Sequence, residues 1–146
     1  MIASTNGRLI AYSILTSVCL LTTGCGGGSA TKVIEGTVSV AGQKADGGEV
    51  RFVPIEGTPG SVNASTITDG KYRLEARGGV PLGKYRVEVT ATKKTGRQVM
   101  QDNGFEKVMG DELVKISPPQ YAGKQSTIVA EITADSDGKF DINITQ

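Results

Sequence analysis

A six-residue phrase occurs three times in this chain, at residues 70–75, 83–88 and 138–143. Each copy has a glycine, a lysine, an aromatic residue, a charged residue, an aliphatic residue and a polar residue, in that order. Glycine supplies the positive φ of a tight turn. The alternation that follows places aromatic and aliphatic side chains on one face of a strand and charged ones on the other. The phrase therefore predicts three turns that lead into half-buried strands, and an antiparallel all-β fold.

The rest of the chain after residue 32 supports this fold class. Segments of β-branched and alternating residues are separated by turn residues such as Asp69-Gly70, a strong hairpin signal. About seven strands are predicted, at 33–40, 49–55, 62–68, 71–76, 84–92, 126–134 and 139–144. Their number and spacing indicate a β-sandwich, and a closed barrel is the alternative. The last two segments are predicted to form a hairpin across 135–138.

The strand phase assigns roles to the residues of the repeated phrase. Tyr72 and Tyr85 fall on the inward face, so both are predicted to pack in the core. Arg73 and Arg86 fall on the outward face and are predicted to be solvated.

The pattern breaks between residues 93 and 116, where glycines at 96, 104 and 110 interrupt any sustained period. This segment is predicted to be a long irregular excursion that ends in a short strand at 112–116. A one-turn helix is expected to follow, with Ser117 as its cap, prolines in its first turn and Tyr121 at its end.

The amino terminus has the form of a secretion signal. Residues 1–8 carry Arg8 and no acidic residue, and residues 9–21 are mainly apolar or small. This apolar run of about 13 residues is shorter than the ~20 residues that a membrane-spanning helix needs. Residues 1–24 are therefore predicted to be a cleaved signal peptide.

The sequence that follows, LTTGCGGG at 21–28, resembles the lipobox of bacterial lipoproteins. The resemblance implies cleavage after Gly24 and lipidation of Cys25, although Thr22 stands where the family usually has leucine. A plain secretory signal is the alternative. The absence of aspartate after the cysteine, where Gly26 stands, favours the outer membrane or the periplasmic face within that family.

Cleavage at this site would leave no disulfide. Cys19 would leave with the signal and Cys25 would become a thioether, so the fold would depend on its core alone. The chain has 16 Lys and Arg against 15 Asp and Glu, and because Arg8 is the only charge in 1–24, the mature chain would carry 15 of each. This balance argues against nucleic acid as a partner. Residues 25–32 are predicted to be a glycine-rich tether and residues 33–146 the folded domain.

The stretch 68–91 resembles the hallmark of carboxypeptidase regulatory-like domains, in which Asp-Gly and an aromatic residue precede a Pro-Gly-x-Tyr turn and a Val-x-Val strand. The matching positions are Asp69, Gly70, Tyr72, Leu74, Pro81, Gly83, Tyr85, Val87 and Val89. Leu82 separates the proline from the glycine, a small departure. The resemblance implies a transthyretin-like, seven-stranded Greek-key β-sandwich. With the lipobox and the late Pro-x-Tyr segment, the chain is similar to small lipoproteins abundant in planctomycetes, for which the resemblance implies no established activity.

The residue inventory argues against an enzyme. The chain has no histidine, which excludes a Ser-His-Asp triad, a Cys-His pair and the usual zinc site. It also lacks the histidines and the carboxy-terminal tetrapeptide of the hydroxyisourate hydrolases, an enzymatic branch of transthyretin-like proteins. Asp135 and Asp137 resemble the start of a calcium loop but lack the later ligands, so no catalytic residue, metal or cofactor is predicted.

Function is therefore predicted to lie in binding. Phe105 and Tyr121 fall in the irregular region and are the candidates for a ligand or partner surface, because long excursions from a rigid scaffold often carry binding sites. The sequence predicts a lipid-anchored cell-envelope module with a non-enzymatic binding or scaffolding role, which contacts the membrane through its lipid and an envelope protein or glycan through its surface. A module that binds polysaccharide or peptidoglycan is the alternative.

Overall fold

The computed structural model describes residues 30–145, and this part of the chain is built from strands and two single-turn 3₁₀ helices, without an α-helix. The all-β prediction is confirmed. The elements are β1 (Thr31–Lys32), β2 (Ile34–Val40), β3 (Gln43–Lys44), β4 (Gly47–Ile55), β5 (Asn63–Thr68), β6 (Lys71–Leu74), η1 (Ala76–Gly78), β7 (Val80–Pro81), β8 (Gly83–Asp102), β9 (Lys107–Lys115), η2 (Pro119–Tyr121), β10 (Val129–Ile132) and β11 (Ile142–Ile144).

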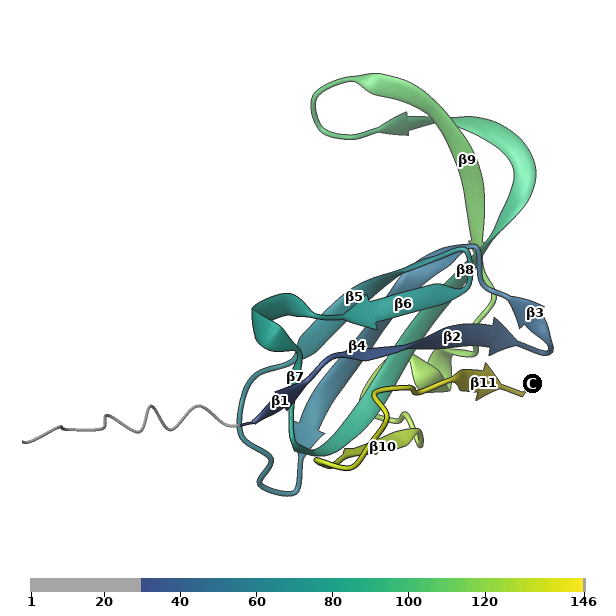
Figure 1. Cartoon of the computed structure of the whole chain (residues 1–146). Coiled ribbons are helices and arrows are strands. Elements are labelled where there is room, and N and C mark those ends of the chain that lie inside the picture. The colour runs from purple at the N-terminus through teal and green to yellow at the C-terminus, as the bar shows by residue number, and fades with distance from the viewer. Residues whose placement is uncertain (1–29, 146) are drawn as a thin grey trace, which may run out of the picture.

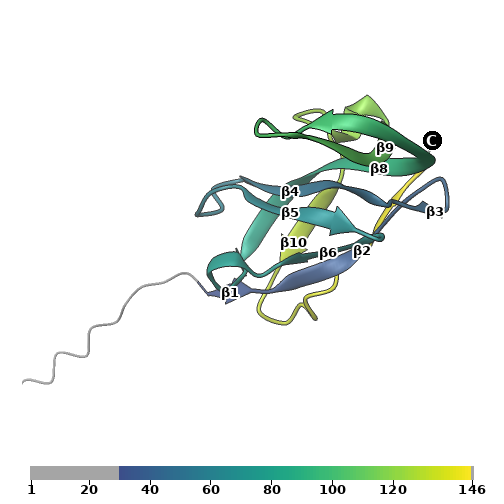
Figure 2. The same ribbon diagram turned by 90° about the horizontal axis from the view of Figure 1, so that it is seen from above.

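One large sheet contains most of these strands, in the order β10-β8-β4-β5-β6-β2-β11, with β3 beside β2 and β9 beside β8. The sheet is strongly curled into a half-barrel (Figures 1 and 2). Its pairs are antiparallel except β11 with β2, which run parallel. A small second sheet consists of β1 and β7.

The core lies inside the curl and follows the predicted alternation. Tyr72 and Tyr85 are buried, as their strand phase predicts. Phe52 of β4 packs between them, with ring centroids 6.3 Å from Tyr72 and 6.0 Å from Tyr85, and with Phe140 at 5.9 Å. Tyr72 donates a hydrogen bond to the Phe140 carbonyl (2.7 Å), and Tyr85 donates one to the Pro81 carbonyl (2.8 Å). Burial raises the pKa of both phenols, so both stay neutral donors that satisfy their buried hydroxyls.

The two arginines predicted to point outward, Arg73 and Arg86, differ in their exposure to solvent. The Arg73 side chain is exposed and lies beside Glu35 and Glu75. Arg86 is only partly exposed, because it lies against the nearly buried Glu88 at 3.0 Å.

The prediction that the last two segments form a hairpin is wrong. β10 pairs with β8, whereas β11 pairs with β2. The chain between them is fixed to the edge of β2, where the Glu35 amide donates to the Gly138 carbonyl (2.8 Å) and the Phe140 amide donates to the Glu35 carbonyl (2.9 Å). Gly36 permits this approach, because a Cβ there would lie 2.0 Å from the Phe140 carbonyl oxygen.

The prediction of an irregular excursion at 93–116 is also wrong, because these residues form a β-hairpin whose register shifts once, between Lys94 and Gln98. β8 continues ten residues beyond its predicted end at Thr92, and β9 returns beside it from Lys107 to Lys115. The predicted short strand at 112–116 is the last part of β9. A hairpin exposed on both faces has no amphipathic period for a sequence pattern to show.

The predicted one-turn helix is present as η2, but Ser117 does not cap it. Its hydroxyl instead accepts a hydrogen bond from the Ala91 amide (3.0 Å). At the amino terminus, Thr31 and Lys32 of the predicted tether form β1 and pair with β7. The predicted signal peptide and Cys25 lie outside the described residues.

Candidate binding surfaces

The β8–β9 hairpin projects from the curled sheet. Residues 93–115, here called the arm, rise from one end of the sheet and bend over at the tip (Figure 1). The other described residues, 30–92 and 116–145, are here called the body. The turn contains Asn103-Gly104, and Gly104 has a φ of 86°. The Asn103 side chain accepts hydrogen bonds from the amides of Phe105 (3.0 Å) and Glu106 (2.9 Å), which close the tip.

Asp46, in the loop between β3 and β4, fixes the base of the arm. Its carboxylate accepts a hydrogen bond from the Lys94 amide (2.9 Å) and contacts the Lys93 ammonium at 3.3 Å. The backbone hydrogen bond from Lys94 is the main cause that holds the pKa of Asp46 below its ordinary value of 3.8. Asp46 therefore ties the loop before β4 to β8 at the base of the arm.

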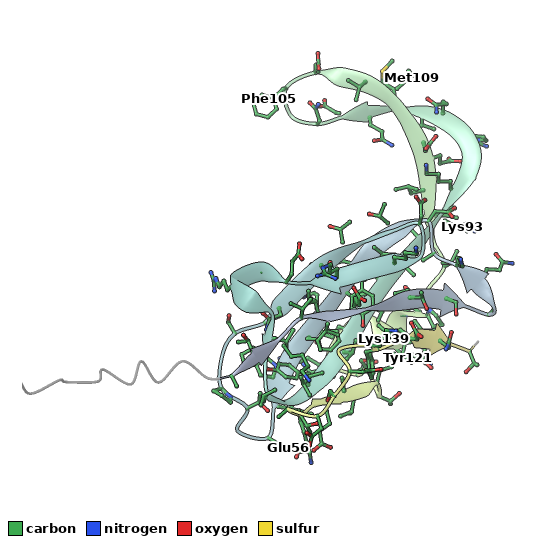
Figure 3. The ribbon with its side chains drawn as sticks, in the orientation of Figure 1. Glu56, Lys93, Phe105, Met109, Tyr121 and Lys139 are labelled. Carbon is green, nitrogen blue, oxygen red and sulfur yellow. The ribbon has the colours of Figure 1, made fainter. Side chains whose placement is uncertain are left out.

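The arm exposes large apolar side chains. Phe105 at the tip is 99% exposed, and the paired residues Met100 and Met109 are 64% and 59% exposed. Leu113 and Val114, nearer the base, are also exposed. Figure 3 shows Phe105 and Met109 at the far end of the arm, away from the body. Such a concentration of exposed apolar side chains is typical of interaction surfaces.

A second concave surface lies over β2, β5 and β6, as an open groove of about 620 Å³. The residues that line it are polar or charged except at its floor, and they include Glu35, Thr37, Thr66, Thr68, Lys71, Arg73, Lys139 and Asp141.

Three of the charged side chains that line this groove have partners. Arg73 lies 2.5 Å from Glu35 and 2.7 Å from Glu75. Asp141 accepts hydrogen bonds from the Thr37 hydroxyl and amide (both 2.8 Å), and these bonds lower its pKa. The groove therefore presents compensated charges together with Lys71 and Lys139, which make no ion pair with any described residue, whereas the arm presents exposed apolar groups.

The two residues predicted for a ligand surface do not lie together. Phe105 is at the tip of the arm, and Tyr121 is on η2, half-buried against the core (Figure 3). Sequence reasoning missed Met100, Met109 and Leu113 as surface residues. The signal that could have found them is Asn103-Gly104, a hairpin dipeptide in the middle of the segment.

The acidic residues of the arm serve its structure. Asp111 lies 2.9 Å from the Lys94 ammonium and accepts a hydrogen bond from the side-chain amide of Gln98 (2.8 Å). Glu112 accepts from the Thr95 hydroxyl (2.7 Å) and from Arg97 (3.2 Å).

Replacing Asp46 by alanine is expected to loosen the arm without unfolding the body. Amide hydrogen exchange at Lys94 and Leu113 should become several-fold faster, because Lys94 loses its carboxylate acceptor. Acid should have the same effect on the unaltered protein. Because the pKa of Asp46 is lower in the folded protein than its ordinary value of 3.8, the ionised carboxylate contributes stability above pH 3.8. This contribution is lost as the pH falls through the pKa of the folded state.

Hydrogen exchange measured by mass spectrometry, with correction for the intrinsic pH dependence, would test this prediction. Asp135→Ala, which removes another exposed acid, should leave the arm unchanged. Equal exchange in the Asp46 variant and the unaltered protein would contradict the assigned role.

Within residues 30–145, no three acidic or cysteine side chains lie close enough to hold a metal ion. None of the helices in that range has the length and apolar character to cross a membrane. Comparisons of the chain with protein-family models, with curated proteins and with solved structures found no match.

Proposed function

We propose that this protein is a non-enzymatic, lipid-anchored module of the cell envelope, and that it binds a partner protein through its arm. The observation that carries the proposal is the exposure of Phe105, Met100 and Met109 on a hairpin that extends from the body. An isolated two-stranded hairpin is marginally stable in water. A two-stranded hairpin that also exposes apolar side chains is expected to have a partner that covers them.

The positions of the amino terminus and the arm support this role. β1 pairs with β7, next to the start of β8 at Gly83, whereas the arm begins at Lys93. Ten residues of β strand span about 30 Å, so the two features lie at opposite ends of the body (Figure 1). With Cys25 lipidated a few residues before β1, the lipid would be attached at the end of the body opposite the arm. An outer-membrane or periplasmic location follows from the lipobox resemblance.

We also propose that the curled sheet is a transthyretin-like Greek-key sandwich of the carboxypeptidase regulatory-like kind. The order β8-β4-β5-β6 supports this assignment. β4, β5 and β6 are consecutive antiparallel neighbours, and β8 returns to lie beside β4, which is the order that defines a Greek key.

Glycan binding has less support than protein binding. Stacking on sugars requires exposed aromatic faces, and the rings of Tyr72 and Tyr85 are buried. Phe105 stands alone at the tip of the arm, because Tyr121 lies against the core.

A photo-crosslinking amino acid placed at Phe105 would test partner binding in intact cells. Val129, 53% exposed on β10 of the body, is the matched control position. We expect a discrete cross-linked product from position 105 and none from position 129. Absence of a product at 105, or the same products from both positions, would contradict the proposal.

A further inference from the structure

The outer edge of β9 has no neighbour. β9 pairs with β8 and with no other described strand, so one edge of a nine-residue strand leaves its amides and carbonyls unpaired. Such an edge is a template for another strand.

The free edge of β8 within the arm is less suited to pairing. The register shifts between Lys94 and Gln98, where residues 95–97 of β8 lie opposite the single residue Glu112 of β9, so that β8 carries two extra residues. Bulges disrupt the ladder and protect an edge from pairing. β9 carries no extra residue from Lys107 to Lys115, whereas the regular part of β8 in the arm is only Gln98–Asp102, so β9 offers the longer edge to a partner strand.

We propose that the strand that occupies this edge is β9 of a second copy of the chain. Two arms would pair antiparallel about a two-fold axis at Met109 and form a four-stranded sheet, β8-β9-β9-β8. This inference rests on the proposed function of the arm as a docking element, and it names the partner.

Charge complementarity favours this register. Residues 107, 109, 111 and 113 share one face of β9, because side chains alternate along a strand. A two-fold axis at Met109 places each Lys107 opposite the second copy's Asp111, and each Leu113 toward the turn of the second copy. Met109 faces its own counterpart. One face of the joint sheet would thus carry a methionine pair and two ion pairs.

The contacts already present in the arm are consistent with these ion pairs. Lys107 makes no ion pair with any described residue, although its cross-strand partner is Asp102. Asp111 contacts the Lys94 ammonium at 2.9 Å, and Lys107 of a second copy would place a second cation beside the same carboxylate.

On the opposite face, the register places Val108 of each copy opposite Gly110 of the other copy. It also places Glu106 opposite Glu112. The carboxylate of Glu112 is already compensated by Arg97 at 3.2 Å and by the Thr95 hydroxyl, which reduces the repulsion between the two acids.

Full overlap of the two strands would be unfavourable. It requires an axis at Asp111, which places Lys107 opposite the second copy's Lys115 and Asp111 opposite itself. Like charges directly opposite one another destabilise a sheet. The shifted register about Met109 removes both conflicts, so the sequence of the edge distinguishes between two alignments of the same strands.

The dimer is expected to be concentration-dependent. A paired edge of about nine residues is only ~30 Å long and is smaller than the interfaces of permanent dimers. Anchoring both copies in one membrane would raise their effective concentration. The near-neutral chain, with a net charge of +1, offers little long-range repulsion between copies.

Cysteine cross-linking of the full-length chain tests the register. A Cys19→Ser background keeps the lipid anchor on Cys25, and because the lipidated Cys25 is a thioether, an introduced cysteine is the only thiol. With Met109→Cys, mild oxidation should produce a disulfide-linked dimer, because directly opposite residues of an antiparallel pair have the Cα separation that a disulfide needs. Leu113→Cys, on the same face, should stay monomeric alone. Lys107→Cys mixed with Asp111→Cys should produce a heterodimer, because the register places these two residues directly opposite one another.

A charge exchange provides a second measurement. Lys107→Asp should weaken dimerisation at least tenfold, since it places acids opposite one another, and adding Asp111→Lys should restore most of it. Circular dichroism would verify that each variant is folded. A dimer in Leu113→Cys but not in Met109→Cys, or no dimer in any variant at the concentration found in the envelope, would overturn the inference.

These outcomes are separable from failure of the proposed function. If Phe105 cross-links a different protein while Met109→Cys stays monomeric, the arm docks a partner and the inference of self-association is wrong. If Phe105 yields no cross-linked product in cells, the docking role itself fails.

Discussion

Replacing Phe52 by alanine is expected to lower the free energy of unfolding by about 3–5 kcal/mol. The Phe52 side chain is fully buried on β4, and three aromatic rings lie around it with centroids 5.9 to 6.3 Å away. Truncation removes the transfer free energy of the ring and leaves a cavity among Tyr72, Tyr85 and Phe140. Tyr72 and Tyr85 belong to β6 and β8, and Phe140 to the segment that precedes β11, so they cannot collapse together without moving the backbone. Equilibrium denaturation followed by circular dichroism would measure the loss.

Phe105→Ala is the matched control, because it removes the same atoms from a side chain that is 99% exposed. This change is expected to alter the free energy of unfolding by less than about 0.5 kcal/mol. Equal losses from the two substitutions would contradict the assignment of Phe52 to the core and of Phe105 to the surface.

Replacing Cys25 by alanine is expected to abolish incorporation of labelled palmitate and to release the protein from membranes. Each CH₂ of a buried acyl chain contributes about 0.8 kcal/mol to membrane binding, so loss of the lipid removes most of the membrane affinity. The remaining apolar run at 9–21 is too short to span a bilayer.

Cys19→Ala serves as the control for this experiment. Cys19 lies within the predicted signal peptide, so its replacement should leave both labelling and membrane fractionation unchanged. If the Cys25 variant retained its label and stayed with the membrane, the lipobox assignment would be wrong.

The burial of the tyrosines illustrates what could be predicted from the sequence. Tyr72 and Tyr85 each stand two residues after a turn glycine, in phase with an aliphatic residue two positions later. Because the side-chain period of a strand is two, this local pattern determines which face each tyrosine occupies. The structure buries both, and their hydroxyls bond to backbone carbonyls.

The arm illustrates what could not be predicted from alternation. Met100 and Met109 face each other across the hairpin, but solvent covers both faces of the arm, so buried and exposed positions do not alternate there. The glycines at 96, 104 and 110 suggested irregularity. In the structure, Gly104 lies in the turn and Gly110 faces the Gln101 side chain. The exposed apolar residues Met100, Met109 and Leu113 were therefore missed, although Phe105 at the tip was identified.

The sequence by itself determined the fold class, the places of most strands and the inward face of each repeated phrase. Each of these depends on neighbouring residues alone, through turn chemistry and the period of two. Only the tertiary structure decided which strands pair, because the energy of pairing depends on burial against segments far away in the chain. For this reason β10 and β11 join β8 and β2 instead of each other. For the same reason β8 extends beyond the sheet and, with β9, forms an arm that the body does not cover.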